Sequence, residues 1–134
     1  MQRDIVLIPY PFSDQSRTKI RPGLILSNDK YNARSEDVVI CAITSNIIAR
    51  EYSILVDEKN LEQKGLHTRS AVLANKLLTI KKTLVIKTIA RIDKPLFAKV
   101  SMKSRELIEE NDFFGAFKGV GPFTKEDRMR SKFE

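Results

Sequence analysis

Two polar residues far apart in the chain, Arg21 and Thr44, stand where apolar strands are expected to begin and end. Arg21 and Pro22 lie near the start of the run "IRPGLILS" (20–27), and Thr44 directly follows the run "DVVICAI" (37–43). If these strands are antiparallel neighbours, the start of one lies beside the end of the other. A guanidinium and a hydroxyl then meet at one rim of a sheet, where both can donate hydrogen bonds to a phosphate.

The loop at 11–19 enters the second strand from the same rim and adds further polar groups. Those groups belong to Asp14, Ser16, Arg17, Thr18 and Lys19. Ser45 adds a second hydroxyl directly after Thr44. The spacing leaves a simpler interpretation open, in which Arg21 pairs with Asp14 as a surface ion pair and Thr44 caps a turn.

Short apolar runs typical of β-strands fill most of the chain before the first helical pattern. We expect strands at 4–10, 20–27, 37–43, 51–57, 70–78 and 84–92, with a connection rich in turn formers at 28–36. The near-continuous apolar run at 37–43 predicts a strand buried on both faces. About six short strands favour a mainly β fold, as a small and strongly curved antiparallel sheet or barrel.

One helix is expected late in the chain. Asp93 is a suitable N-cap and Pro95 suits the first turn. One apolar stripe at helical spacing is formed by Phe97, Val100, Leu107 and Ile108. A tail rich in phenylalanine and glycine follows the helix, and we expect it to pack on the domain or on a second copy of it.

Length and composition indicate one domain without an internal disulfide. The chain has 134 residues and a single cysteine, Cys41, inside an apolar run. We interpret Cys41 as a small buried hydrophobe in a reducing compartment, and no Cys/His set has metal-ligand spacing. The first apolar stretch is short, is broken by Pro9 and Pro11, and lacks the layout of a signal peptide. We therefore expect a cytoplasmic protein that does not cross a membrane.

The positive charge is concentrated in one part of the sequence. The formal net charge is +7, and residues 76–105 hold nine Lys/Arg against one acid, Asp93. Such an excess of positive charge fits a surface that binds a polyanion such as RNA. A solvated face that only keeps the protein soluble explains the charge equally well.

Three stretches, in this order, resemble the MazF/PemK family of toxin endoribonucleases. They are "DIVLIPYPFSDQSRTKIRPGLILSND" (4–29), "CAITS" (41–45) and "SAVLANKLLTIKKTLVIKTIARID" (70–93). The resemblance extends from residue 3 to about residue 108. It implies a small SH3-like β-barrel of the CcdB/MazF type, with about six or seven strands and a late α-helix. We assign 1–112 to this barrel domain and 113–134 to the Phe-rich C-terminal tail.

The resemblance also implies a function and a set of site residues. It implies the toxin of a type II toxin–antitoxin pair, which cleaves single-stranded RNA selectively by attack of the ribose 2′-hydroxyl on the adjacent phosphate. Neither a metal nor another cofactor is implied, whereas a homodimer and a cognate antitoxin are. Arg21 and Thr44 match the catalytic positions, and a fixed guanidinium would stabilise charge that develops on phosphorus. The residues expected to contact RNA are Phe12, Asp14, Lys19, Ser45, Asn75 and Lys76.

Two positions depart from the family pattern. Asn75 stands where relatives often have an acid, and Leu73 stands where many have an arginine. Asn75 cannot shuttle a proton, so either Asp14, Lys76 or bound water serves instead, or activity is low. The alternative is a catalytically weak or inactive barrel that binds protein, as gyrase-poisoning relatives do, or nucleic acid. We interpret the single histidine, His67, as an ordinary loop residue.

Overall fold

The computed structural model describes residues 1–11, 18–63, 65–66 and 68–109. The chain divides into two compact units, Met1–Ser104 and Arg105–Glu134. The predictions for Phe12, Asp14, His67 and the tail at 113–134 lie outside the described residues. The predicted boundary after residue 112 lies there too and stays a prediction.

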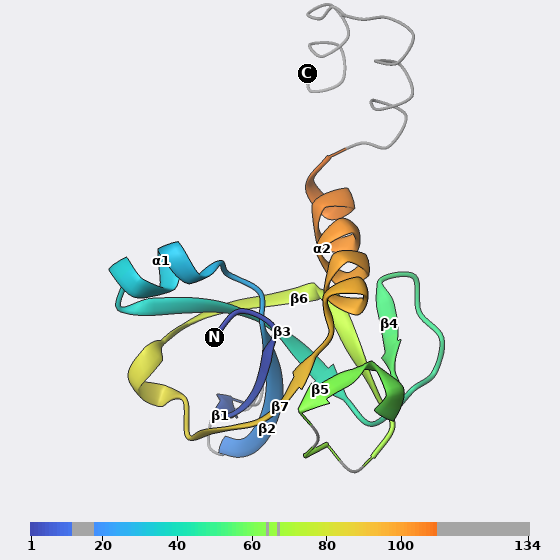
Figure 1. Ribbon diagram of the computed structural model, residues 1–134, viewed down its shortest axis with the longest axis horizontal. Coiled ribbons are helices and arrows are strands. Elements are labelled where there is room, and N and C mark those ends of the chain that lie inside the picture. The colour runs from blue at the N-terminus through green and yellow to red at the C-terminus, as the bar shows by residue number, and fades with distance from the viewer. Residues whose placement is uncertain (12–17, 64, 67, 110–134) are drawn as a thin grey trace, which may run out of the picture. The chain divides into compact units, whose positions relative to one another are not determined.

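The strands form one antiparallel sheet that curls into a half-barrel (Figure 1). The described strands are β1 (Asp4–Pro11), β2 (Thr18–Ile25), β3 (Asp37–Thr44), β4 (Ser53–Val56), β5 (Leu61–Gln63), β6 (Ser70–Lys81) and β7 (Lys87–Ile92). Their order in the sheet is β4-β6-β3-β2-β1-β7-β5. The helices are α1 (Asp29–Arg34) and α2 (Lys94–Ile108), with 3-10 turns η1 (Glu58–Asn60) and η2 (Lys82–Leu84). The predicted mainly β fold with a late helix is confirmed.

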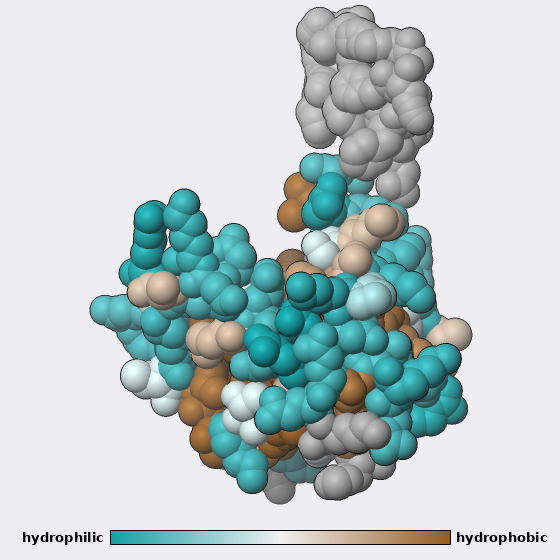
Figure 2. Space-filling view, in the orientation of Figure 1, coloured by the Kyte–Doolittle hydropathy of each residue, from teal (hydrophilic) through white to brown (hydrophobic). Residues whose placement is uncertain are grey.

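The sheet buries apolar side chains on both of its faces. One cluster contains Ile5, Leu24, Cys41, Ile43, Val56, Leu61, Val72, Ala74, Ala90 and Ile92, together with Leu96 and Val100 of α2. The other contains Val6, Ile8, Ile25, Val38 and Ile40. Because β3 contributes to both clusters, its near-continuous apolar sequence is explained and the predicted two-sided burial is confirmed. Hydrophilic residues cover much of the side seen in Figure 2.

The connection at 28–36 contains a helix that the sequence pattern does not predict. α1 has six residues, and the Asn28 side chain caps it by accepting a hydrogen bond from the Tyr31 N–H at 2.8 Å. Its buried residue is polar: Asn32 is 3% exposed and donates to the Ser27 carbonyl at 2.9 Å. Since α1 is anchored by an asparagine rather than an apolar stripe, hydrophobic periodicity cannot reveal it.

Helix α2 begins as predicted but buries a different face. The Leu96 N–H donates to the Asp93 carboxylate at 2.9 Å, which confirms Asp93 as the N-cap. The buried residues are Leu96, Val100 and Ser104, at four-residue spacing. The predicted stripe is therefore wrong at Leu107 and Ile108, which are 43% and 79% exposed. None of the described helices is long and apolar enough to span a membrane.

Cys41 lies in the core, as predicted. Its side chain has no solvent exposure, and burial raises the pKa of the thiol to about 11, although a hydrogen bond with Ser104 opposes that rise. The buried position disfavours the thiolate, which is the nucleophilic form. Cys41 therefore acts as a packing residue at neutral pH.

Candidate nucleic-acid interface

The strand register brings Arg21 and Thr44 to the same level of the sheet. β2 and β3 are antiparallel neighbours, and Gly23 lies opposite Ala42. Continuing this register by two residues places Arg21 beside Thr44. Opposed residues of antiparallel strands project from the same face, so both side chains belong to one face of the sheet. The expectation that the two strands are antiparallel neighbours is confirmed, but β2 begins at Thr18, so Arg21 is its fourth residue and not its start.

This part of the sheet carries small side chains. Ser53, Leu73, Ala42 and Gly23 form one row of cross-strand partners, from β4 to β2. A second row lies two residues further along each strand. In it Leu55 of β4 pairs with Ala71 of β6, and Ala71 pairs with Thr44 of β3. Arg21 of β2 completes the second row when the β2–β3 register is continued. Alternate residues of a strand share a face, so both rows lie on the same face of the sheet. We call these eight residues, four in each row, the Thr44 face. Of these eight residues, Arg21 and Leu55 are exposed, Gly23 and Ala71 are buried, and the other four are half-buried.

Among the residues that the structure describes, the Thr44 hydroxyl takes part in one hydrogen bond. The Asn46 N–H donates to its hydroxyl oxygen at 3.0 Å, so Thr44 does cap the turn that follows β3. A hydroxyl that accepts through oxygen can still donate its own proton. Thr44 is half-buried, whereas Ser45, Lys19 and Arg21 are exposed. Lys19 lies two residues from Arg21 in β2 and so points to the same face.

Asn75 and Lys76 lie on a bulge of β6. Neighbouring β3 residues Cys41 and Ala42 pair with Leu77 and Leu73, so β6 loops out Ala74–Lys76 between them. Asn75 and Lys76 are exposed on this bulge, which lies two to three residues along β3 from Thr44. The fold therefore brings both residues into the neighbourhood of the Thr44 face.

Backbone hydrogen bonds fix the buried start of this bulge. The Ala74 N–H donates to the Tyr52 carbonyl at 2.9 Å. The Ser104 hydroxyl donates to the Ala74 carbonyl, also at 2.9 Å, and Ser104 is only 6% exposed. Lys103, the neighbour of Ser104 on α2, lies over the Tyr52 ring with 5.7 Å between its ammonium nitrogen and the ring centroid. Segments distant in sequence thus position Asn75 and Lys76.

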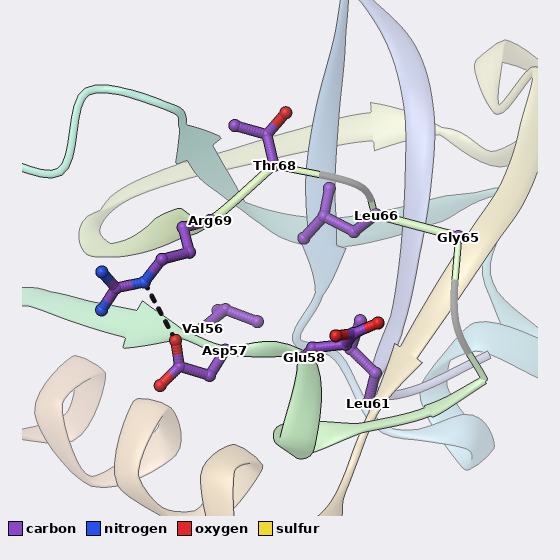
Figure 3. A pocket seen from close by; sticks show the side chains of 8 residues that line it. All are labelled: Val56, Asp57, Glu58, Leu61, Gly65, Leu66, Thr68 and Arg69. Atoms are coloured by element: carbon purple, nitrogen blue, oxygen red, sulfur yellow. Dashed lines mark hydrogen bonds and ion pairs between the residues drawn. The ribbon is translucent and has the colours of Figure 1, made fainter.

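A pocket that the sequence pattern does not predict opens at the ends of β4 and β6 (Figure 3). It has a volume of about 270 Å³ and is lined by Val56, Asp57, Glu58, Leu61, Gly65, Leu66, Thr68 and Arg69. At its mouth the Arg69 Nε lies 3.1 Å from the Asp57 carboxylate. The lining comes from short segments between β4 and β6, and no spacing motif marks them.

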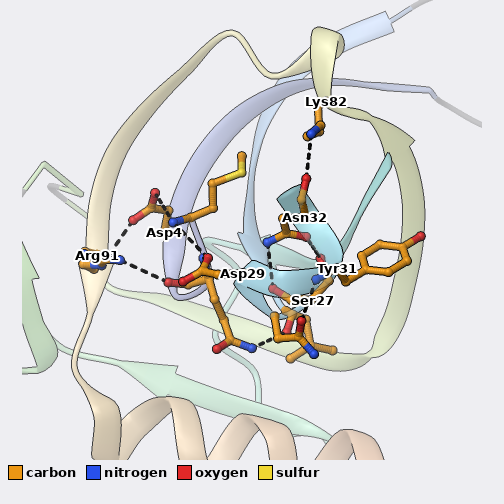
Figure 4. Close-up of polar contacts among 11 residues, drawn as sticks. Asp4, Ser27, Asp29, Tyr31, Asn32, Lys82 and Arg91 are labelled. Carbon is orange, nitrogen blue, oxygen red and sulfur yellow. Dashed lines mark hydrogen bonds and ion pairs between the residues drawn. The ribbon is translucent and has the colours of Figure 1, made fainter. Parts of the chain in front are cut away.

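The cations of 76–105 lie on several elements and have different partners. Lys81 pairs with Glu36 at 3.3 Å, Lys82 donates to the Asn32 carbonyl at 2.6 Å, and Arg91 pairs with Asp4 at 3.3 Å. Figure 4 shows the last two of these contacts in separate places. Other members of the group lie on β6, β7 and α2. The charge excess in the sequence is therefore distributed over several elements.

The fold is that of MazF-type toxins. A mycobacterial endoribonuclease solved with its cognate antitoxin superposes with a TM-score of 0.67 at 15% identity, covering 81% of this chain and 93% of that one. The Mycobacterium tuberculosis toxin MazF-mt6 superposes with a TM-score of 0.63 at 19% identity, covering 79% of this chain and 96% of that one. A chain of a MazE–MazF complex from Deinococcus radiodurans superposes with a TM-score of 0.62 at 20% identity, covering 79% of this chain and 91% of that one. At these identities the likeness establishes the fold.

The sequence establishes the family. The family model of PemK-like, MazF-like toxins of type II toxin–antitoxin systems matches residues 1–108. This chain therefore belongs to that toxin family, and the predicted family resemblance is confirmed. No curated protein matches the chain significantly.

Proposed function

We propose that the protein is a metal-independent, sequence-selective endoribonuclease and the toxin of a type II toxin–antitoxin pair. It acts in the cytoplasm on single-stranded RNA, where the ribose 2′-hydroxyl attacks the adjacent phosphate. The products are a 2′,3′-cyclic phosphate and a 5′-hydroxyl. The observation that supports the proposal is the pairing of Gly23 in β2 with Ala42 in β3, because this register, continued by two residues, puts Arg21 level with Thr44.

Each of the two residues has a role that its chemistry permits. Arg21 keeps its charge at every relevant pH and offers paired N–H donors to a phosphate whose negative charge grows during attack. Thr44 donates its hydroxyl proton to a phosphoryl oxygen or orients the attacking hydroxyl. Neither is a general base near neutral pH.

The remaining predicted residues bind the RNA on either side of these two. Lys19 lies two residues from Arg21 in β2, Ser45 directly follows Thr44 at the end of β3, and the β6 bulge supplies Asn75 and Lys76. Phe12 and Asp14 belong to the loop between β1 and β2 and complete the proposed set. Lys19 and Lys76 are exposed cations that can each neutralise a phosphate.

We propose that a second copy of the chain and an antitoxin also bind the toxin. Ile47, Ile48 and Leu55 lie in or just before β4 and are 41%, 62% and 41% exposed. Exposed apolar residues this close in sequence favour burial against another chain. Two of the three similar structures named above contain an antitoxin, which supports the same kind of partner here.

A second candidate is a barrel of the same fold that binds RNA or protein and cleaves poorly. It is favoured by the side chains next to the Thr44 face. Leu73 belongs to that face and is uncharged, and Asn75 on the bulge has no proton to exchange near neutral pH. The proposed nuclease then relies on Asp14, Lys76 or water for proton transfer.

Cleavage in excess EDTA with end-group analysis tests the proposal. We expect purified protein to cut single-stranded RNA without added metal and to leave cyclic phosphate and 5′-hydroxyl ends. Arg21→Ala should abolish cutting and leave the thermal melt nearly unchanged, because Arg21 is exposed. RNA left intact at high enzyme concentration, or a strict need for Mg²⁺, would contradict the nuclease mechanism. Loss of the fold in Arg21→Ala would show that the arginine has a structural role.

A further inference from the structure

One polar residue interrupts the apolar stripe by which α2 packs on the sheet. The buried residues of α2 are Leu96, Val100 and Ser104, and Ser104 stands where this spacing predicts a third apolar side chain. Ser104 is only 6% exposed. A buried hydroxyl is tolerated where it has hydrogen-bond partners, so the partners of Ser104 indicate its role.

The Ser104 hydroxyl lies where three elements meet. It donates a hydrogen bond to the Ala74 carbonyl of β6 at 2.9 Å. It also shares a hydrogen bond with the side chain of Cys41 in β3. Because the single hydroxyl proton is given to Ala74, the hydroxyl oxygen is left to accept the thiol proton. Ser104 therefore joins α2 to β3 and to β6 at one point.

At this point the pairing of β3 with β6 is interrupted. The register shifts between Cys41 and Ala42, and the bulge of Ala74–Lys76 has no counterpart in β3. Backbone groups in a bulge need hydrogen bonds from other segments. The Ala74 carbonyl accepts from Ser104, and the Ala74 N–H donates to the Tyr52 carbonyl at 2.9 Å. Figure 1 shows β6 changing direction beside α2, where these contacts lie.

We propose that Ser104 is a positioning residue for RNA binding, which holds the β6 bulge so that Lys76 reaches a phosphate of the RNA. The inference rests on the proposed function, because it takes the RNA to lie along the Thr44 face. Asn75 and Lys76 directly follow Ala74 and are exposed. Holding both backbone groups of Ala74 therefore limits the positions that the Lys76 ammonium can take.

Ser104 acts from the opposite side of the sheet. Leu96 and Val100 of α2 belong to the same core cluster as Cys41. Ala42 follows Cys41 in β3 and belongs to the Thr44 face, and neighbouring residues of a strand point to opposite faces. Because α2 packs on the face that the RNA does not contact, Ser104 influences RNA only through the bulge.

A second residue of α2 supports the other anchor of the bulge. The Lys103 ammonium nitrogen lies 5.7 Å from the centroid of the Tyr52 ring, which is within the range of a cation–π contact. Tyr52 supplies the carbonyl that accepts from Ala74. Two consecutive residues of α2 therefore contact the groups that hold Ala74.

A bulge that is held before binding favours RNA affinity. Ordering a loose segment during binding costs conformational entropy for each residue that becomes fixed. Ala74 is fully buried and Ser104 nearly so, so water poorly replaces a missing hydroxyl. Without that hydroxyl, part of the favourable contact between Lys76 and a phosphate is lost in ordering the bulge.

RNA binding at several salt concentrations tests the proposal without any need for cleavage. A single-stranded RNA with methylated 2′-hydroxyls is titrated into wild type, Ser104→Ala, Lys76→Ala and the double variant. Lys76→Ala should reduce the log–log salt slope by about 0.7, the value of one phosphate contact, and Ser104→Ala should also reduce it. The double variant should bind within about twofold of Lys76→Ala alone, because both changes remove the same contact. Independent effects that multiply would overturn the proposal.

Two further variants separate the hydroxyl from overall stability. Ser101→Ala is the matched control, because Ser101 is half-buried on the same helix, and its salt slope should equal that of wild type. Ser104→Thr keeps the hydroxyl and should retain the wild-type slope, although its added methyl group lowers the melting temperature. A wild-type slope in Ser104→Ala, or a slope in Ser104→Thr as low as that of Ser104→Ala, would contradict the positioning role.

Kinetics on a cleavable RNA give a readout that a loss of stability does not produce. Arg21 and Thr44 are unchanged in Ser104→Ala, so KM should rise and kcat should stay the same, as expected when only binding is weakened. Partial unfolding would instead lower the active fraction, and with it kcat, at constant KM. That second pattern would refute the role of Ser104 in RNA binding.

The outcomes separate the two proposals. If wild type cuts RNA and Ser104→Ala matches it in salt slope and KM, the role of Ser104 is refuted and the nuclease proposal stands. If the salt slopes and the double variant behave as expected but no RNA is cut, the nuclease proposal fails and Ser104 stands as a positioning residue for RNA binding. If wild type does not bind RNA, both proposals fail.

Discussion

Replacing Ser104 by alanine removes the hydroxyl that ties α2 to the β6 bulge. This hydroxyl is 2.9 Å from the Ala74 carbonyl oxygen, at a residue that is 6% exposed. The substitution leaves a carbonyl without its partner in a place that water reaches poorly. The cost of such a group is about 1–3 kcal/mol, which is a large part of a typical unfolding free energy of about 5–15 kcal/mol.

Urea denaturation measures this loss. With a slope of about 1–3 kcal/mol per molar urea, we expect the midpoint to fall by roughly 1 M. Ser101→Ala is the control, because it makes the same substitution one turn earlier on α2 at a half-buried residue. Its midpoint should stay close to that of wild type.

Amide exchange locates the effect within the fold. The Ala74 N–H is bonded to the Tyr52 carbonyl, and loosening the bulge exposes it. We expect the exchange of Ala74 in Ser104→Ala to be about tenfold to a hundredfold faster, since each 1.4 kcal/mol corresponds to a factor of ten. A midpoint equal to that of Ser101→Ala, together with unchanged exchange at Ala74, would refute the idea that Ser104 holds the bulge.

Further predictions concern pH, salt and packing. Because burial raises the pKa of the Cys41 thiol from 9.0 to about 11, the stabilising effect of the protonated thiol is present below pH 9 and is lost as pH rises to 11. Wild type should lose about 3 kcal/mol relative to Cys41→Ala over this range, and parallel titration curves would contradict this. Lys76→Ala should reduce the log–log salt slope of RNA binding by about 0.7, whereas an unchanged slope would remove Lys76 from the interface. Gly65→Ala should cost about 1–3 kcal/mol through overpacking against the Ile89 carbonyl; a wild-type melt would exclude the close contact.

The strands and the late helix could be predicted from the sequence because each has a local pattern. Alternating or continuous apolar runs report burial in a strand, and Asp93 followed by Pro95 marks a helix start. The ordered motifs around Arg21 and Thr44 also carried the family assignment. Pro22 was expected at the start of its strand, but β2 begins at Thr18, so Arg21 and Pro22 lie within it.

The tertiary structure decided the features that depend on distant partners. α1 forms around a buried Asn32, the bulge of Ala74–Lys76 depends on Ser104 and Tyr52, and the pocket joins the end of β4 to the start of β6. None of these has an apolar period, because each is held by hydrogen bonds or contacts between segments far apart in the chain. The sequence by itself indicated candidates for contacting a phosphate, Arg21 and Thr44 among them. Only the register of β2 with β3, continued by two residues, puts these two residues on one face, since side-chain direction in a sheet follows from register.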